Sequence, residues 1–218
     1  MKKIIIIGGG GHAKSVIGII KKIRKYKIIG YCDIKNQGEI LGIEYLGNDN
    51  QAVDIKKQSP DCDAAIGIGY VEISDARKKI IEKFQGWGFH FPAIISPTAI
   101  INEDILIQDG VVIHDNVVIN VCSKIGGFSI INNNVCIDHD CTIEEFCHIC
   151  PGAVLSGGVY IGCHSIIGAN STIIHSQRIG PSCLIGAGAV VVNDCIKKGI
   201  YRGIPAKYEH ELRFKGKS

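Results

Sequence analysis

The 218-residue sequence lacks the features that mark nucleic-acid-binding and membrane proteins. Its formal net charge is only +3 and its basic residues are dispersed, which argues against binding to nucleic acid or to an anionic membrane surface. No apolar run approaches the length of a membrane span. The opening MKKIIIIGGGG superficially resembles a signal peptide, but the apolar run Ile4–Ile7 ends in four glycines and is better explained as a buried strand. We therefore expect a cytoplasmic protein.

The stretch from residue 95 to residue 191 lacks both the 3.6-residue period of a helix and the two-residue period of a simple strand. Instead, an aliphatic residue stands at every sixth position without a break in register. The positions are Ile95, Ile101, Ile107, Ile113, Ile119, Ile125, Ile131, Ile137, Ile143, Ile149, Leu155, Ile161, Ile167, Ile173, Ile179, Ile185 and Val191. A parallel β-helix has this spacing because each six-residue unit supplies one strand and one corner, and three units close a coil of eighteen residues. We predict a β-helix over residues 95–195 and a C-terminal cap over residues 196–218.

The faces of such a β-helix are flat and pack well against copies of themselves, so we expect a homotrimer. Cysteine is abundant, with ten residues. Cys141, Cys147, Cys183 and Cys195 share one phase of the repeat, where a compact apolar side chain suits close packing. We therefore expect reduced thiols rather than disulfides.

The first 85 residues carry a different pattern, in which short apolar segments alternate with amphipathic ones. We expect parallel strands at Lys3–Ile7, Lys27–Cys32 and Asp63–Gly67, and helices after the glycines, at Asn50–Lys57 and at Glu72–Phe84. This alternation predicts a small, doubly wound, Rossmann-like α/β domain over residues 1–85. A linker rich in glycine and proline follows over residues 86–94.

The carboxyl ends of parallel strands meet at one edge of a sheet, where helix N-termini offer N–H groups to ligands. Gly8 to His12 follow the first expected strand, Asp33 the second, and Gly67 closes the third. We interpret this edge as a site for a nucleotide or a phosphorylated ligand. The alternative is that the glycines only permit tight turns. A dehydrogenase is less well supported, because the domain has about half the strands of a dinucleotide-binding fold.

His139 lies at a predicted corner between Asp138 and Asp140. A carboxylate beside an imidazole fixes its tautomer and raises its basicity, which suits a general base, although an exposed corner histidine can also be merely hydrogen-bonded. Gly157 stands eighteen residues further on, so we expect it one coil away, about 4.8 Å along the axis. There it leaves room for a ligand and offers its N–H to an oxyanion. His148 is half a coil from His139, so a site that contains both must be shared between subunits.

The histidines also lack the spacing of a known metal site. Trimeric β-helix zinc proteins of the γ-carbonic anhydrase type use two histidines five residues apart, and no such pair occurs here. Cys147 and Cys150 form a C-x-x-C without a second pair. We expect no metal.

Three motifs together resemble a known family. They are I-I-I-G-x-G-G-H-A-K at residues 5–14, H-D-C at residues 139–141 and G-I-P-A-K at residues 203–207. Over essentially the whole chain, the sequence resembles the bacterial sugar acetyltransferases of the NeuD and PglD type. The resemblance implies a left-handed β-helix and the transfer of an acetyl group from acetyl-CoA to a nucleotide-activated or acidic sugar.

Taken residue by residue, the resemblance implies that His139 is the general base and that Asp140 supports it. Combined with the strand-end positions, it predicts nucleotide-sugar and acceptor contacts at Gly8, Gly10, His12, Asp33, Lys35, Gly67 and Asn132. It implies acetyl-CoA contacts at His148, Gly157, Ala169 and Ala187. Asp33 matches the first of two adjacent acids in nucleotide-sugar binders, whereas Ile34 occupies the second position here.

Our leading hypothesis is N-acetylation of an amino-deoxy sugar attached to a nucleoside diphosphate, in a homotrimer with active sites between subunits. One alternative is O-acetylation of a sialic-acid-like sugar by the same fold and base. A second alternative is a trimeric ligand-binding scaffold without catalytic activity.

Overall fold

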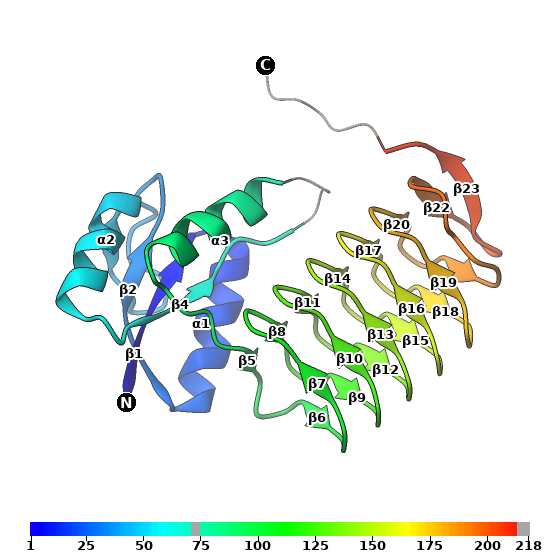
Figure 1. The fold of residues 1–218 in the computed structure, drawn as a ribbon, viewed down its shortest axis with the longest axis horizontal. Coiled ribbons are helices and arrows are strands. Elements are labelled where there is room, and N and C mark those ends of the chain that lie inside the picture. Colours follow the sequence, from blue (N-terminus) through cyan, green and yellow to red (C-terminus); the bar gives the residue numbers. More distant parts are fainter. Residues whose placement is uncertain (71–74, 213–218) are drawn as a thin grey trace. The chain divides into compact units, whose positions relative to one another are not determined.

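The computed structural model describes residues 1–70 and 75–212 and divides into two compact units (Figure 1). The first unit comprises Met1–Tyr70 and Asp75–Pro97, and the second contains the chain from Thr98 onward. The predicted start of a helix at Glu72 and the last six residues of the predicted cap lie outside the described residues. In the part of the chain that is described, no helix is both long and apolar enough to cross a membrane.

The first unit is built on a parallel sheet with the strand order β3-β2-β1-β4. Its strands are β1 (Lys2–Ile7), β2 (Tyr26–Cys32), β3 (Tyr45–Gly47), β4 (Asp63–Ile66) and, outside that sheet order, β5 (Ile94–Ile95); its helices are α1 (Gly11–Ile23), α2 (Asp49–Gln58) and α3 (Ala76–Gly86). The isoleucines of β1 are buried because this strand is central and covered on both faces. Strands and helices alternate as predicted. Strand β3 was not expected, because its three residues form no apolar run.

The segment expected as a linker, residues 86–94, is packed against the first unit. Phe89 and Phe91 are buried, and the ring of Phe89 lies 5.6 Å from the ring of Phe84 on α3. Ala64 on β4 donates its N–H to the carbonyl of His90 at 2.9 Å. The compact unit therefore extends to Pro97.

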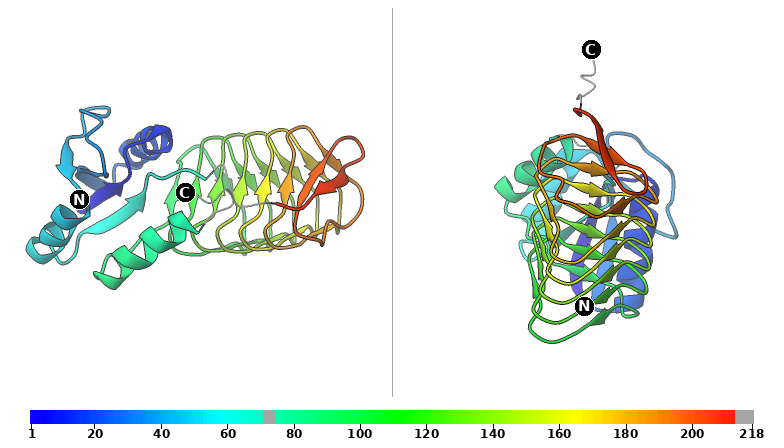
Figure 2. Two further views of the ribbon diagram at one scale, coloured as in Figure 1. Left: turned by 90° about the horizontal axis from the view of Figure 1, so that it is seen from above. Right: turned by 90° about the vertical axis from the view of Figure 1, so that its right-hand side faces the viewer.

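The second unit is a parallel β-helix whose coils stack along one axis (Figure 2). Its two-residue strands are β6 (Ile100–Ile101), β7 (Leu106–Ile107), β8 (Val112–Ile113), β9 (Val118–Ile119), β10 (Lys124–Ile125), β11 (Ile130–Ile131), β12 (Cys136–Ile137), β13 (Thr142–Ile143), β14 (His148–Ile149), β15 (Val154–Leu155), β16 (Tyr160–Ile161), β17 (Ile166–Ile167), β18 (Thr172–Ile173), β19 (Arg178–Ile179), β20 (Leu184–Ile185) and β21 (Val190–Val191). Partners stand eighteen residues apart, as for Ile125 and Ile143. The repeated aliphatic of each unit from Ile113 onward is buried, which confirms the predicted coil.

Two further strands, β22 (Ile200–Arg202) and β23 (Lys207–His210), close the end of the β-helix as an antiparallel pair. All ten cysteines are free thiols, and Cys141, Cys147, Cys183 and Cys195 are buried, so they act as packing residues as predicted. Burial raises the pKa of the Cys147 thiol to about 12, which keeps it protonated.

The corners stack into edges that run along the β-helix axis. We call the stack of turns at residues 103–104, 121–122, 139–140, 157–158 and 175–176 the His139 edge, and the stack at residues 133–134, 151–152, 169–170 and 187–188 the Asn132 edge. Each turn is tied to the next by a backbone hydrogen bond, such as Gly158 N–H to the His139 carbonyl at 2.9 Å. The second residue of each turn has a φ between +54° and +71°, and Asn, Asp and Gly are common there because they tolerate this conformation.

Candidate functional site

His139 and Asp140 form a hydrogen-bonded pair in the turn between β12 and β13. Nδ1 of His139 lies 2.7 Å from Oδ2 of Asp140. A carboxylate only accepts hydrogen bonds, so Nδ1 carries the proton and Nε2 of the neutral ring keeps its lone pair. The side chain of His139 is 53% exposed. The hydrogen bond that His139 donates to Asp140, and then the charge of Asp138, raise the pKa of His139 above its usual value.

Gly157 lies directly against the His139 ring, one coil away, as the eighteen-residue arithmetic predicted. A Cβ on Gly157 would stand 2.6 Å from both Cε1 and Nε2 of His139, so any side chain there would collide with the ring. The Gly157 N–H is directed at the Asp138 carboxylate and helps to lower its pKa. The expected donor to an oxyanion therefore already faces a carboxylate in this structure, and its catalytic role stays a prediction.

Asn132 and His148 come together on the Asn132 edge and the strand β14 that leads to it. The Asn132 side-chain nitrogen lies 3.3 Å from Nε2 of His148. His148 is only 8% exposed, and His114, one coil below Asn132, is 4% exposed. Burial, and then the neighbouring imidazole of His148, lower the pKa of His114 to about 4. These side chains therefore form a second cluster.

Ala169 and Ala187 occupy successive turns of the Asn132 edge, where Gly188 donates its N–H to the Ala169 carbonyl at 2.8 Å. The predicted contacts thus form two groups within one chain. His139, Asp140 and Gly157 lie on the His139 edge, whereas Asn132, His148, Ala169 and Ala187 lie on or beside the Asn132 edge. The sheet of β6, β9, β12, β15, β18 and β21 separates them.

In the first unit, Asp33 holds the glycine turn. Its Oδ2 accepts the Gly9 N–H at 2.6 Å, and its Oδ1 accepts the Lys35 N–H at 3.1 Å. Gly8 has a φ of +99°, and a Cβ there would lie 2.6 Å from the Ile68 side chain. Asp33 therefore stabilises the glycine turn through hydrogen bonds, and Gly8 is required by its backbone conformation and by the close approach of Ile68.

Gly10, His12 and Gly67 complete the predicted edge of the first unit. A Cβ on Gly67 would lie 2.8 Å from the Cβ of Ala13, so glycine is required where β4 ends against α1. Gly10 is the N-cap of α1, and a Cβ added to it would have no neighbouring atom within 4 Å, so this residue faces open space. His12 lies in the first turn of α1, 3.2 Å from where a Cβ of Gly69 would stand. The strand ends therefore meet at one edge, as predicted.

Comparison with known proteins identifies the fold and its chemistry. Residues 3–84 match the PglD N-terminal domain family. A histidine-to-asparagine mutant of perosamine N-acetyltransferase from Caulobacter crescentus, in complex with CoA and GDP-perosamine, is 30% identical, with a TM-score of 0.89 over 97% of this chain and 98% of that chain. The acetyltransferase domain of PglB from Neisseria gonorrhoeae FA1090 is 30% identical, with a TM-score of 0.88 over 96% and 100% of the two chains. WeeI from Acinetobacter baumannii AYE, at 22% identity and a TM-score of 0.83 over 96% and 100% of the two chains, shows the fold alone.

The chain belongs to the PglD-type sugar acetyltransferases. The predicted resemblance is confirmed, and so is the fold class, a Rossmann-like domain followed by a left-handed β-helix.

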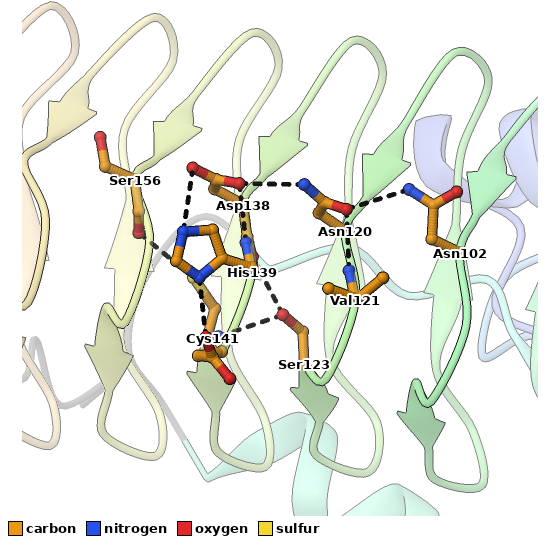
Figure 3. A network of polar contacts seen from close by, with 9 residues as sticks. Asn102, Asn120, Val121, Ser123, Asp138, His139, Cys141 and Ser156 are labelled. Carbon is orange, nitrogen blue, oxygen red and sulfur yellow. Dashed lines mark hydrogen bonds and ion pairs between the residues drawn. The ribbon is translucent and has the colours of Figure 1, made fainter.

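Two features of the candidate site were not anticipated from the sequence. One is an asparagine ladder, in which Asn102 donates to Asn120 at 3.2 Å and Asn120 donates to Asp138 at 3.0 Å (Figure 3). The other is His114 beneath Asn132. Both were detectable, because residues 102, 120 and 138, and likewise 114 and 132, are eighteen apart and must stack.

The acetyltransferase was expected to use no metal. Among residues 1–70 and 75–212, no group of three His, Cys, Asp or Glu side chains is arranged to hold a metal ion.

Proposed function

We propose that this acetyltransferase transfers the acetyl group of acetyl-CoA to the amino group of a nucleotide-linked amino-deoxy sugar. The observation that carries the proposal is the His139–Asp140 pair, which leaves the lone pair on Nε2 of a half-exposed imidazole beside Gly157. The relatives support the substrate class, because perosamine N-acetyltransferase was solved with CoA and GDP-perosamine, and the PglB domain with acetyl coenzyme A. Both proteins are 30% identical to this chain and match it over 96–97% of its length.

In the proposed reaction, the lone pair of the acceptor amine attacks the thioester carbonyl carbon and a C–N bond forms. Nε2 of His139 takes the proton that the nitrogen must lose, and Asp140 stabilises the imidazolium that results. The tetrahedral intermediate then collapses, the C–S bond breaks, and CoA leaves as a thiolate. The proton on His139 passes to the thiolate, which returns the base to its neutral form.

We further propose a homotrimer whose active sites lie between subunits. The sheet of β6, β9, β12, β15, β18 and β21 has the His139 edge along one side and the Asn132 edge along the other. Its outer surface carries the small or β-branched residues Ile100, Val118, Cys136, Val154, Thr172 and Val190, and Ile100 is 56% exposed. An apolar sheet face of this kind suits burial against copies of itself. Three copies arranged with these faces inward bring the His139 edge of each chain to the Asn132 edge of its neighbour.

In that arrangement, His148, Ala169 and Ala187 of one chain would line the acetyl-CoA side of a site whose base comes from the next chain. Asn132 would lie on the acceptor side. The edge of the first unit with Gly8, Gly10 and Asp33 would hold the nucleotide of the acceptor, because helix N-terminal N–H groups suit a diphosphate.

The test is thiol release from acetyl-CoA with a panel of GDP- and UDP-linked amino sugars and free nonulosonic acids, with the product identified by mass spectrometry. Turnover of the nucleotide amino sugars supports the proposal. Turnover of the nonulosonic acids alone would indicate O-acetylation, and no turnover with any of them would favour a scaffold.

His139→Ala should lower kcat by about a hundredfold with little change in CoA affinity, at the low end of the range for a general base because an amine already has a nucleophilic lone pair. His175→Ala is the matched control, since His175 is also exposed on the His139 edge, two coils away. A fully active His139→Ala enzyme would remove this histidine from the mechanism.

A further inference from the structure

Asp138 presents one carboxylate oxygen toward a ring nitrogen of His139 (Figure 3). Its Oδ1 accepts hydrogen bonds from the Asn120 side chain at 3.0 Å and from the His139 backbone N–H at 2.8 Å. Its Oδ2 lies 4.0 Å from Nε2 of His139, too far for a direct hydrogen bond. The Gly157 N–H is directed at the same carboxylate, whose two oxygens can each accept more than one hydrogen bond. Two hydrogen-bond acceptors, one carboxylate oxygen and one imidazole nitrogen, therefore stand 4.0 Å apart.

The asparagine ladder fixes the orientation of this carboxylate. Asn120 uses its Oδ1 to accept from Asn102 and from the Val121 N–H, at 3.2 and 2.9 Å, so its Nδ2 must point at Asp138. The His139 backbone N–H, and then Asn120, lower the pKa of Asp138 below its usual value. The side chain therefore stays ionised, and Oδ2 remains an acceptor, throughout the neutral range.

We propose that Asp138 is a specificity-determining residue that selects an amine over a hydroxyl as the acceptor. The inference rests on the proposed function and deepens it. A primary amine has two N–H groups and one lone pair. One N–H is donated to Nε2 of His139 and the other to Oδ2 of Asp138, which leaves the lone pair for the thioester carbon.

The spacing of the two acceptors fits a single nitrogen. An atom about 3 Å from each of two acceptors 4.0 Å apart sees them at an angle of roughly 85°, and bending each hydrogen bond by about 10° accommodates the H–N–H angle. A hydroxyl has only one O–H. It can satisfy His139 or Asp138, and the remaining acceptor then faces an oxygen lone pair. Sites built around a second N–H discriminate strongly against such a partner.

The same arrangement assigns each proton of the amine. As the C–N bond forms, the nitrogen becomes cationic, and the N–H that faces Nε2 is transferred to His139. The N–H held by Asp138 is retained and becomes the amide N–H of the product. Asp138 therefore binds the reacting nitrogen without taking a proton, whereas His139 takes the proton.

The experiment compares the binding of two probes to the full chain with CoA bound. The probes are GDP-perosamine and the GDP-6-deoxyhexose with a hydroxyl on the same carbon, and dissociation constants are measured by calorimetry. We expect the wild-type protein to bind the amine about ten- to a hundredfold more tightly than the hydroxyl. In Asp138→Asn the new amide N–H faces the acceptor, so the preference should fall to within about threefold or reverse.

Two further variants separate this role from a general effect of charge or folding. Asp104→Asn removes the same charge from another turn of the His139 edge and should keep the full preference. Asn120→Ala removes the side-chain hydrogen bond that orients the Asp138 carboxylate, so this variant should lose part of the preference for the amine. An unchanged preference in both Asp138→Asn and Asn120→Ala, or no preference in the wild type, would overturn the inference. If the wild type binds neither these probes nor the corresponding UDP-linked pair, the proposed function itself fails and the inference falls with it.

Discussion

His139 and His114 belong to the same β-helix but experience opposite environments. His139 is half exposed at an edge, with carboxylates on both sides, and its pKa is raised. His114 is buried beside a second imidazole, and its pKa is lowered to about 4. Exposure to water and the nearest charges account for the difference, since the side chains are identical.

The contrast separates a histidine that can exchange protons near neutral pH from one that cannot. The pKa of His139 is raised, and the hydrogen bond from Nδ1 to Asp140 holds the tautomer with the lone pair on Nε2. His114 stays neutral above about pH 4, so it acts in this structure as a packed, polar support for the Asn132 edge.

The largest expected effect concerns the stability contributed by His114. Its folded pKa of about 4 lies below the unfolded value of 6.5, so the unfolded chain binds more protons between these pH values. Stability therefore rises with pH across this window, and about 3 kcal/mol is lost as the pH falls from 6.5 to 4. The charged or titratable groups that face it are His148 and Asp115.

Urea unfolding at fixed protein concentration, from pH 7 to pH 4, checks this expectation. His114→Leu should flatten the pH dependence relative to the wild-type protein, because an apolar side chain cannot titrate. His139→Ala should not flatten it, because a raised pKa contributes stability at low pH that is lost as the pH rises. Equal slopes for His114→Leu and the wild type would contradict the assigned environment.

The second expected effect concerns the space beside His139. In Gly157→Ala the new Cβ would stand 2.6 Å from Nε2, so the ring must move away from the acceptor. We expect kcat/KM to fall by about a hundredfold, the cost of misplacing a catalytic group by about 1 Å. The matched control is Gly127→Ala, at the same turn position of a different edge, where the closest contact would be 3.3 Å. Normal activity of Gly157→Ala would show that the ring tolerates displacement.

The β-helix could be predicted from the sequence almost completely, because its long-range contacts repeat every eighteen residues. The six-residue register alone predicted that Gly157 lies against His139 and that His148 lies on another face of the β-helix. A local repeat therefore determined contacts that ordinarily require tertiary information. The same arithmetic would have revealed the stacking of Asn102, Asn120 and Asp138, but the direction of each amide depends on hydrogen-bond partners that no spacing reports.

The first unit could be predicted only in outline. Its strands and helices follow from apolar runs, but β3 is too short to give a signal. The packing of Phe89 and Phe91 within an apparent linker was missed, because glycine and proline dominate the local composition. Asp33 was predicted as a ligand contact, and the structure gives its carboxylate a backbone partner at Gly9. Contacts between non-repeating segments depend on tertiary packing, which propensity does not encode.

The smallest expected effect concerns the exposed histidine, His139, and the pH dependence of the reaction. Asp140 is the main cause of the raised pKa of His139. A general base must be neutral, so kcat/KM should rise with pH through the pKa of His139. Asp140→Asn removes the charge and lowers that pKa, so the rising limb of the pH profile should move to lower pH. Its plateau should fall as the base weakens.

Asp104→Asn, on the same edge but away from the ring, should leave the midpoint unchanged. If Asp140→Asn also leaves it unchanged, the ionisation seen in the profile belongs to a group other than His139, and the base must be sought elsewhere.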